Sequence, residues 1–220
     1  MNHSIVTTID GSHTIYNKTL DEHYHSTHGA IQEAELVYIQ NALGYSKKQN
    51  ISIFEVGFGT GLNAFLSAIH ASEQKRKIHY ITIEKFPIQK EMVSELNYTS
   101  FFKEEYKSLF HSIHSCIWEK KEVINEYFSI HKIEGDLLDF PIIPQYDIVY
   151  FDAFAPNKQD EMWSLEIFEY LFQNMNENGI ITTYCAKGEV RRMLQQSGFT
   201  MERIPGPPGK REMLRGMKLF

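Results

Sequence analysis

Hydrophobic and polar residues alternate along the chain with two different periods, and each period predicts one kind of element. Residues 5–9 and 13–16 alternate β-branched with polar side chains around Asp10-Gly11, which predicts a β-hairpin. From Ala30 to Leu43 the apolar positions recur at helical spacing, and Gly44 follows where a glycine commonly ends a helix. The chain is therefore expected to begin with a hairpin and an amphipathic helix.

The rest of the chain alternates apolar runs typical of strands with segments of helical period. The expected strands are 51–56, 78–84, 123–133, 146–151 and 179–184. The expected helices are 62–72, a segment opened by Pro87 and running toward Leu96, 98–118, 160–175 and 187–196. Residues 199–203 and 213–219 are expected to form a terminal antiparallel hairpin. Such alternation predicts an α/β fold whose mostly parallel sheet binds ligands beyond the carboxyl ends of its strands.

Length and composition limit the domain organisation. The chain has 220 residues, of which 42% are hydrophobic and 23% charged, and this suits one substantial core. We expect residues 1–45 to form an extension packed on a core domain of residues 46–220. Cys116 and Cys185 form neither a disulfide framework nor a CxxC motif. With no apolar run of the roughly 20 residues that a membrane span requires and no signal-like N-terminus, a cytoplasmic protein without a membrane partner is expected.

A cluster of glycines lies between the strand 51–56 and its helix. Gly57, Gly59 and Gly61 permit unusual backbone angles and a close approach of the backbone to a ligand. Glu84 ends the next expected strand, where a carboxylate can accept hydrogen bonds from both ribose hydroxyl groups of a nucleoside. Asp136 follows the third expected strand and can accept a hydrogen bond from an adenine amino group. The three motifs together outline an adenosine site.

Two alternatives to this adenosine site stay open. The glycines can form a tight turn only, with the two carboxylates as solvated loop residues. NAD uses a related framework, but the spacing Gly-x-Gly-x-Gly departs from Gly-x-Gly-x-x-Gly, and the chain lacks room for a separate substrate domain. The antiparallel terminal hairpin also favours a Rossmann-like class I methyltransferase fold, so S-adenosyl-L-methionine is the expected cofactor.

A further motif follows the apolar strand 146–151. The sequence from Asp152 to Pro156, DAFAP, places a carboxylate, an aromatic ring and a rigid turn at the ligand-binding edge of the sheet. An amine must lose a proton before or during attack on a sulfonium methyl group, so we predict that Asp152 orients the amine and helps its deprotonation. Phe154 and Pro156 are expected to shape the alignment of the reacting atoms. A turn cap at Asp152 and a core aromatic at Phe154 are the alternatives.

Three histidines, His23, His25 and His28, precede the first expected helix. No matching cysteine or fourth ligand accompanies them, and methyl transfer from a sulfonium requires no metal, so no metal site is expected. Tyr24, His28 and Glu33 can instead line the site from an N-terminal lid. An ordinary packed junction between hairpin and helix is an equal alternative.

Several longer segments together resemble the MnmD family, which also forms the methyltransferase half of MnmC proteins. The resemblance rests on EVGFGTGLN (55–63), EKFP (84–87), DAFAPNKQDEMW (152–163), VRR (190–192) and GKREMLRG (209–216). It extends from about the N-terminal hairpin to the C-terminus, and its longer segments are far more specific than a glycine loop. With the carboxylates above, it predicts cofactor contacts by Glu55, Gly57, Gly59, Thr60, Gly61, Asn63, Glu84, Lys85, Asp136 and Asp152.

The same resemblance implies a reaction. It implies methylation of the aminomethyl nitrogen of 5-aminomethyl-2-thiouridine at the tRNA wobble position, which gives 5-methylaminomethyl-2-thiouridine. Asp152 would lie beside the amine, and Phe154 with its loop would receive the base. In fused relatives a flavin-dependent domain produces the amine, so a separate upstream enzyme is expected to supply it here.

The distribution of charge agrees with an RNA partner. The whole chain has a net charge of −6, but residues 187–220 carry +5 and the remainder −11. Lysines and arginines that contact phosphates position RNA without reading its sequence, whereas a splayed base supplies specificity. Solvated or carboxylate-paired cations are the alternative. The expected tRNA-binding residues are Tyr24, His28, Pro156, Arg191, Arg192, Lys210 and Arg211.

The residues alone leave two further functions open. A protein or a small-molecule amine can be the methyl acceptor, since the glycine loop and Asp152 suit either. The chain can also be a cofactor-binding or RNA-binding module without turnover.

Overall fold

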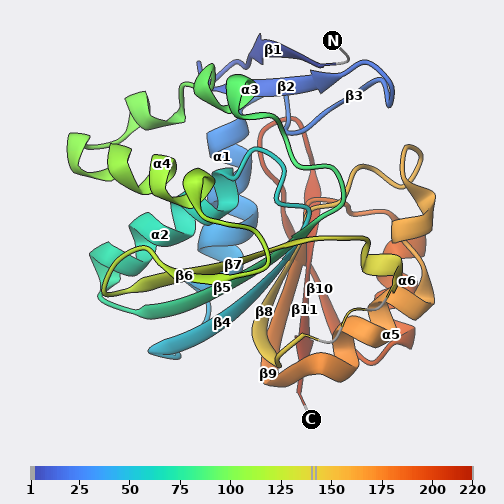
Figure 1. The fold of residues 1–220 in the computed structure, drawn as a ribbon. Coiled ribbons are helices and arrows are strands. Elements are labelled where there is room, and N and C mark those ends of the chain that lie inside the picture. Colours follow the sequence, from blue (N-terminus) through green and yellow to red (C-terminus); the bar gives the residue numbers. More distant parts are fainter. Residues whose placement is uncertain (1–2, 140, 142, 220) are drawn as a thin grey trace.

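The central sheet of the protein contains eight strands, five of them in a parallel arrangement (Figure 1). The computed structural model describes residues 3–139, 141 and 143–219. The parallel strands are β4 (Asn50–Val56), β5 (Lys77–Glu84), β7 (Phe128–Glu134), β8 (Tyr146–Phe151) and β9 (Met175–Thr183). The antiparallel strands are β6 (Lys121–Val123), β10 (Thr200–Pro205) and β11 (Glu212–Lys218). The strand order is β10-β11-β9-β8-β4-β5-β7-β6.

The chain reverses its direction of travel across the sheet next to β4. From β4 it proceeds to β5 and β7 on one side, and it then returns to β8 on the other side of β4. In open α/β sheets a ligand crevice forms at such a reversal, outside the carboxyl ends of the strands. The glycine loop after β4 and the segment that begins at Asp152 after β8 both lie at this point. The Asp152 N–H donates to the Val56 carbonyl at 3.1 Å, which joins the two segments.

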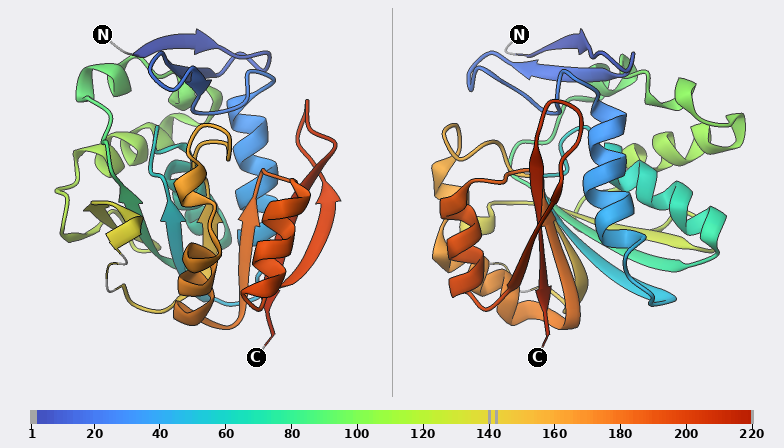
Figure 2. Two further views of the ribbon diagram at one scale, coloured as in Figure 1. Left: turned by 90° about the vertical axis from the view of Figure 1, so that its right-hand side faces the viewer. Right: turned by 180° about the vertical axis from the view of Figure 1, so that it is seen from behind.

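Helices cover both faces of the sheet (Figures 1 and 2). One face carries α1 (Ala30–Ala34), the continuing π-helical segment η1 (Glu35–Leu43), α2 (Leu62–Gln74) and α4 (Lys107–Ser115). The other face carries α5 (Leu165–Asn174) and α6 (Gly188–Gln196). Because both faces are covered, the central strands bury side chains on both sides: Ile53 packs into one core, Phe54 into the other, and every residue of β8 is buried.

A separate three-stranded sheet lies over the edge where the parallel strands end (Figure 2). It consists of β1 (His3–Thr7), β2 (His13–Asn17) and β3 (Glu22–His23). The segment after β3 contacts the glycine loop, since His25 Nε2 lies 2.7 Å from Thr60 Oγ1. Burial lowers the pKa of His25 to about 4, so this histidine stays neutral and its ring bonds to the threonine hydroxyl. The small sheet thus forms a roof that is fastened to the loop beneath it.

The structure confirms the predicted α/β fold, with its mostly parallel sheet, antiparallel ending and N-terminal hairpin, and it corrects several elements. Residues 123–133 are not one strand, because a turn at 124–127 separates β6 from β7, and Asn125 Oδ1 accepts the amide hydrogens of Tyr127 and Phe128 there. Pro87 does not open a helix. The helix α3 (Lys90–Ser94) begins three residues later, since the Phe86 N–H donates to the Glu84 carboxylate and holds the chain in a turn.

Two expected helices are interrupted. Residues 98–118 contain the 3₁₀ turns η2 (Tyr98–Phe101) and η3 (Glu104–Tyr106) before α4, and residues 160–175 contain η5 (Asp160–Met162) before α5. Ser164 caps α5, because its side chain accepts the Ile167 amide hydrogen. A further 3₁₀ turn, η4 (Leu137–Asp139), follows β7.

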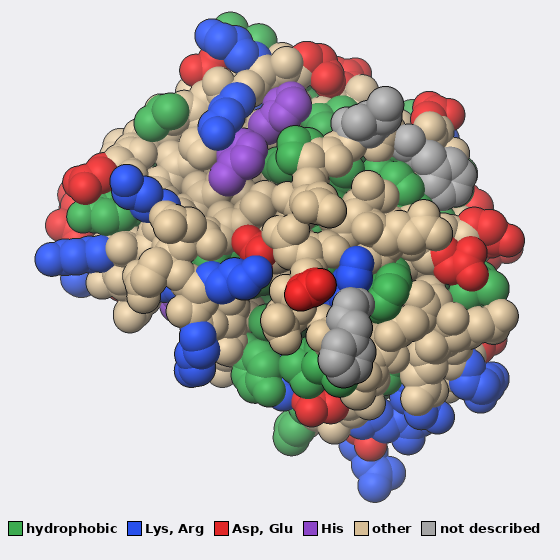
Figure 3. Space-filling view, turned by 90° about the horizontal axis from the view of Figure 1, so that it is seen from below, with side chains coloured by type: hydrophobic (Ala, Val, Ile, Leu, Met, Phe, Trp, Pro, Cys, Tyr) green, Lys and Arg blue, Asp and Glu red, His purple; other side chains and the backbone are tan. Residues whose placement is uncertain are grey.

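Figure 3 shows the surface opposite the small sheet, on which basic, acidic and hydrophobic side chains are interspersed. Within the described residues, no helix combines the length and apolar character needed to cross a membrane.

Candidate functional site

A cavity of about 800 Å³ lies beneath the small sheet, at the carboxyl ends of β4, β5, β7 and β8. Its roof comes from β2, β3 and the segment to Thr27, and its floor from the glycine loop and the ends of the parallel strands. The loop 153–159 and the side chains of Tyr184 and Lys210 close it laterally. This position is the crevice that the reversal of strand order predicts.

The glycine loop and Glu84 form one end of the cavity. The Glu84 carboxylate accepts the Gly59 N–H at 3.0 Å and the Phe86 N–H at 2.9 Å, so it is fixed against the loop. Gly57 has φ 90°, and a Cβ atom there would lie 2.9 Å from the Asp152 carbonyl oxygen. Only glycine therefore lets the loop after β4 run this close to the segment after β8.

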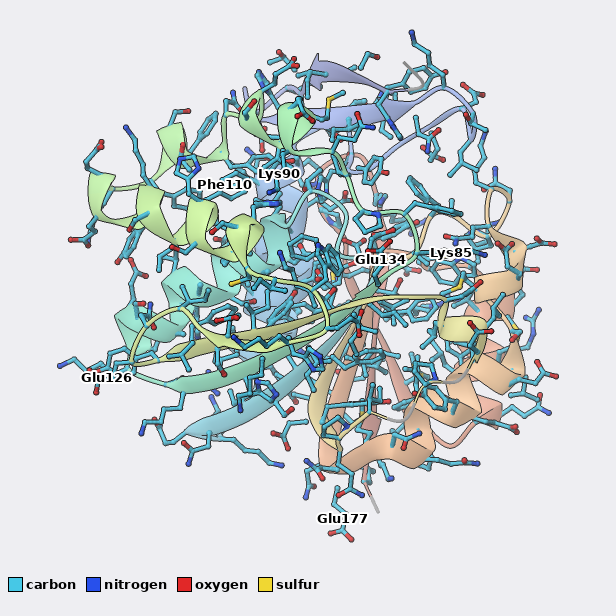
Figure 4. All side chains as sticks on the ribbon, viewed as in Figure 1. Lys85, Lys90, Phe110, Glu126, Glu134 and Glu177 are labelled. Carbon is cyan, nitrogen blue, oxygen red and sulfur yellow. The ribbon has the colours of Figure 1, made fainter. Side chains whose placement is uncertain are left out.

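Lys85 and Asp136 form an ion pair on the cavity wall, with Nζ and Oδ2 2.6 Å apart. Lys85 lies beside Glu134 at the ends of β5 and β7 (Figure 4). Burial acts to raise the pKa of Asp136, but the hydrogen bonds from Lys85 and the Leu138 N–H outweigh it and hold the pKa below its usual value. Asp136 is thus an ionised acceptor in the position expected for an adenine amino group.

Four of the predicted cofactor residues lie behind the cavity wall and do not line it: Glu55, Thr60, Gly61 and Asn63. Glu55 is fully buried beside β5, where its Oε2 accepts the Thr82 hydroxyl at 2.8 Å, and burial raises its pKa to about 8. Because helices cover both faces of the sheet, a side chain in the middle of β4 such as Glu55 is enclosed whichever face it points to. In this structure the four residues lie next to the cavity, and their contacts with the cofactor stay a prediction.

Thr60, Gly61 and Asn63 each hold a neighbour of the cavity in place. The Thr60 hydroxyl joins His25 and Tyr98. A Cβ on Gly61 would lie 2.6 Å from His114 Nε2, so this glycine makes room for the histidine that bonds the Thr60 carbonyl. The Asn63 amide donates to Asp152 Oδ2 at 2.8 Å.

Asp152 and Phe154 line the part of the cavity wall that follows β8, next to the glycine loop. Burial raises the pKa of Asp152 to about 6, although the hydrogen bonds from Tyr38 and Asn63 oppose the rise. Phe154 packs edge-on against Tyr24 of the roof, with ring centroids 5.0 Å apart. The Trp163 Nε1–H donates to the Phe154 carbonyl at 2.7 Å, which fixes the loop. The structure therefore brings together Asp152, Phe154 and Tyr24, as the sequence predicts.

Three further residues line this part of the cavity: Glu33, which the sequence analysis names as a lid residue, Lys210, which it assigns to RNA binding, and Tyr184, which it does not identify. Glu33 and Lys210 form an ion pair of 2.5 Å inside the cavity, and Lys210 Nζ lies 3.9 Å from the centroid of the Tyr184 ring. The sequence predicts Lys210 on the RNA backbone, yet its ammonium faces inward. Tyr184 follows β9, and its hydroxyl donates to the Ala153 carbonyl at 2.8 Å. Glu33 has only its place in the lid segment as a signal in the sequence, and Tyr184 has none.

The other predicted RNA-binding residues lie outside the cavity lining. Arg192 and Arg211 are exposed, and Arg191 donates to Gln195 Oε1 at 3.1 Å. His28 is exposed and packs against Gly209. Pro156 lies at the end of the loop that carries Phe154. The histidines do not converge, because His25 is bound to Thr60 whereas the ring of His23 packs on Tyr16 at 4.9 Å.

The cavity suits an adenosine-containing sulfonium cofactor. Gly57 and Gly59 have no Cβ atoms, so a ligand can approach the backbone of the loop closely. A Cβ on Gly59 would lie 3.1 Å from Tyr24. Glu84 and Asp136 place acidic acceptors along one side, and Asp152 places a third beyond them. Glu84 and Asp136 would hold the ribose and the adenine of S-adenosyl-L-methionine, and Asp152 would face the side of the cavity where the methyl group is transferred.

Comparison with known proteins points to the same cofactor, S-adenosyl-L-methionine. Residues 97–219, more than half of the chain, match the family model described as S-adenosyl-L-methionine-dependent methyltransferase. The chain is 29% identical to the tRNA 5-methylaminomethyl-2-thiouridine biosynthesis bifunctional protein MnmC of Idiomarina loihiensis, covering 90% of this chain and 36% of that protein. It is 31% identical to the MnmC of Pseudomonas fluorescens, over 91% of this chain and 32% of the relative. The chain thus spans about a third of the length of these relatives.

A solved structure agrees with the sequence matches. MNMC2 from Aquifex aeolicus superposes with a TM-score of 0.82 at 26% identity, over 97% of this chain and 70% of that one. Spermidine synthase from Thermotoga maritima has a TM-score of 0.60 at 11% identity, which shows a shared fold only. The resemblance to MnmD and to the methyltransferase half of MnmC is confirmed, and so is the expected cofactor, S-adenosyl-L-methionine. The chain belongs to the family of S-adenosyl-L-methionine-dependent methyltransferases.

Proposed function

We propose that the protein methylates the aminomethyl nitrogen of 5-aminomethyl-2-thiouridine at the wobble position of tRNA, giving 5-methylaminomethyl-2-thiouridine. The names of the MnmC relatives support this substrate. The observation that carries the proposal is a half-buried carboxylate, Asp152, on the cavity wall next to the glycine loop, in a cavity that the aromatic pair Phe154 and Tyr24 also lines. A carboxylate suits an amine, and aromatic rings suit a base that is splayed out of RNA.

The residues of the cavity divide the work of the reaction. S-adenosyl-L-methionine supplies an electrophilic methyl group when bound. Glu84 and Asp136 fix the nucleoside side of the cavity, and Tyr24 and Phe154 orient the base. Asp152 accepts a hydrogen bond from the amine and directs the nitrogen lone pair toward the methyl carbon. Since such a displacement needs little further covalent chemistry, alignment of the reacting atoms provides much of the rate.

Proton transfer is the second task of Asp152. The nitrogen gains a positive charge as the carbon–nitrogen bond forms, and the product must release one proton. A carboxyl group with a pKa of about 6 is ionised at neutral pH, so it can take this proton. Its pKa is also close enough to neutral pH for it to release the proton again. The raised pKa that burial causes therefore suits a general base.

The proposal also implies an upstream reaction, a part of the tRNA that is bound and a cellular location. Methyl transfer does not create the primary amine, so another reaction has to supply the aminomethyl group on the tRNA. The anticodon loop is the part of tRNA that presents the wobble base to the cavity. We also propose a cytoplasmic location, because it fits a tRNA substrate.

The test is a nucleoside assay. Purified protein is incubated with S-adenosyl-L-methionine and tRNA that carries 5-aminomethyl-2-thiouridine, and the digested nucleosides are analysed by mass spectrometry. We expect a gain of one methyl group on that nucleoside, and no gain on tRNA with unmodified wobble uridine. Absence of product on the aminomethylated tRNA, or methylation that persists on a protein or free amine after all RNA is removed, contradicts the proposal.

A further inference from the structure

An ion pair lies in the wall of the acceptor end of the cavity. Glu33 of α1 is 6% exposed, and its Oε2 accepts the Ser26 N–H at 2.8 Å while its Oε1 binds Lys210 Nζ at 2.5 Å. Lys210 comes from the loop between β10 and β11, and its ammonium lies over the Tyr184 ring. Residues from three distant parts of the sequence thus meet beside Asp152 without contacting its carboxylate.

Both charges of this pair act on Asp152. After burial and its hydrogen bonds, the negative charge of Glu33 raises the pKa of Asp152 and the positive charge of Lys210 lowers it. An amine bound to Asp152 lies within reach of the same two charges. Other titratable groups packed around Asp152 and this ion pair come from the neighbouring elements: Tyr38, Glu55, Tyr184, Cys185 and His25. Within the described residues, none of these five groups forms a salt bridge, so Glu33 and Lys210 are the ion pair of this region.

The loop that carries Lys210 is held so that the lysine faces inward. Gly209 packs against His28, and the Gly206 N–H bonds to the Arg211 carbonyl. Arg211, the next residue, is exposed on the outer side. Neighbouring cations of one loop therefore have different surroundings, one inside the cavity and one in solvent.

We propose that Glu33 and Lys210 are positioning residues that set the proton occupancy of the acceptor amine. Lys210 disfavours the ammonium form of the amine, while Glu33 favours it and holds Lys210 over Tyr184. In the reaction, the lone pair of the neutral amine forms the carbon–nitrogen bond, the carbon–sulfur bond breaks with its electrons going to sulfur, and the surplus proton of the nitrogen passes to Asp152. The proposal rests on the proposed amine methylation, and it removes Lys210 from the phosphate contacts.

The test breaks the same ion pair from either side. The variants are Lys210→Met, Glu33→Gln and the double variant, and kcat/KM is measured from pH 5 to pH 9 on an aminomethylated anticodon stem-loop. Removing the positive charge raises the pKa of the amine, so Lys210→Met is expected to move the acidic limb up by about one pH unit, a loss of about tenfold below the midpoint. Glu33→Gln is expected to move it down by a similar amount, and the double variant to return it near the wild-type value.

Opposite shifts separate this role from a structural one. If the ion pair only stabilised the fold, both single variants would lose activity at every pH with an unchanged midpoint, and this would overturn the proposal. Lys210→Arg retains the charge and is expected to retain the wild-type midpoint. Arg211→Met is the matched control, expected to raise KM and weaken its salt dependence without moving the midpoint. The same salt effect in Lys210→Met, with no shift of the midpoint, would assign Lys210 to a phosphate instead.

A second measurement does not depend on the substrate. The carboxyl resonance of Asp152 is titrated by ¹³C NMR in the free protein. We expect the pKa of Asp152 to rise in Lys210→Met and to fall in Glu33→Gln. Equal pKa values in the two variants would overturn the inference even if tRNA is methylated. Opposite shifts in a protein that methylates no tRNA would contradict only the proposed function.

Discussion

At the scale of single residues, the two buried carboxyl groups of the site have different tasks. Asp152 faces the cavity, whereas Glu55 is enclosed between the strands. Burial raises the pKa of both, to about 6 and about 8 respectively. One carboxyl group is therefore ionised at neutral pH and available for chemistry, and the other is protonated and contributes to the fold.

Replacing Asp152 by asparagine is expected to reduce kcat by about 10²–10⁴-fold, because the amine loses its proton acceptor. The cofactor site should remain, since Glu84 and the glycine loop are untouched, and calorimetry should give a similar Kd for S-adenosyl-L-methionine. The exposed Asp160, from the same motif, is the matched control: Asp160→Asn should keep the wild-type kcat. A wild-type kcat in Asp152→Asn would remove Asp152 from the mechanism.

Glu55 gives a prediction about stability and pH. Its pKa is raised from 4.5 to about 8, so the folded state favours the protonated form. The stability that this form contributes is complete below pH 4.5 and is lost as the pH rises toward 8, since the unfolded chain ionises first. Glu55→Gln removes the loss. In urea titrations the stability of the variant relative to wild type should therefore rise by about 3 kcal/mol between pH 5 and pH 8.

The control for this experiment is Glu126→Gln, at an exposed position in the turn after β6, far from Lys85 in Figure 4. Its stability relative to wild type should not change with pH. A Glu55→Gln variant that loses stability at pH 8 would mean that the buried carboxylate is ionised and bound by its neighbours.

The sequence predicts the site residues that lie at strand ends better than those that long-range packing brings to the cavity. Gly57, Gly59 and Glu84 are predictable because they lie at or just after the end of a strand, and strand ends of a parallel sheet meet at one edge. Glu33 is predicted only as part of a lid, and Tyr184 is not predicted, because both reach the cavity through long-range packing of α1 and of the segment after β9. Glu55 shows the converse, since its motif suggests a ligand contact but helices cover both faces of β4 and enclose its side chain.

At the scale of elements, the glycine loop after β4 has to approach the segment after β8 closely to form one side of the cavity. Gly57→Ala adds a Cβ 2.9 Å from the Asp152 carbonyl at φ 90°, so the loop must move away from the segment after β8. We expect S-adenosyl-L-methionine to bind at least about tenfold more weakly, which corresponds to about 1.4 kcal/mol, as measured by calorimetry.

Gly188→Ala is the comparison for this variant, because Gly188 begins α6 and its added Cβ would lie 3.3 Å from the flexible Arg192 side chain only. It should bind the cofactor as wild type does. Equal binding by Gly57→Ala would show that the loop adapts and that the close approach is not required.

Most elements follow from their period, and the exceptions have local causes. Strands such as β4, β5 and β8 are predictable because they are rich in β-branched and aromatic residues and are mostly apolar, as strands covered on both faces are. The turn between β6 and β7 depends on Asn125, whose side chain bonds two amides, and the late start of α3 depends on Glu84 binding the Phe86 N–H. Side-chain bonds of this kind leave no periodic signal in the sequence.

At the scale of the whole molecule, charge is separated between the chain's two parts. Residues 187–220 carry +5 against −11 elsewhere, so a polyanion meets favourable potential only near the C-terminal elements. Lys210 and Arg215 are already paired with Glu33 and Glu202, so they do not add to this potential at full strength. The exposed Arg192 and its neighbour Arg191 on α6 are the better placed cations.

If α6 contacts the RNA backbone, its arginines should control the salt dependence of binding. Each phosphate contact releases counterions, so the logarithm of affinity falls linearly with the logarithm of salt concentration. Replacing Arg191 and Arg192 by alanine should weaken binding of an anticodon stem-loop and reduce the slope by about 1–2 in fluorescence anisotropy, while Kd for the cofactor stays unchanged. Arg203→Ala, which removes a cation paired with Glu212 at 3.7 Å, should leave the slope as it is. If the double variant at Arg191 and Arg192 has the same slope as Arg203→Ala, the RNA binds to another face of the protein. Because the cavity opens beneath the small sheet, the surface around Tyr24 would then be tested next.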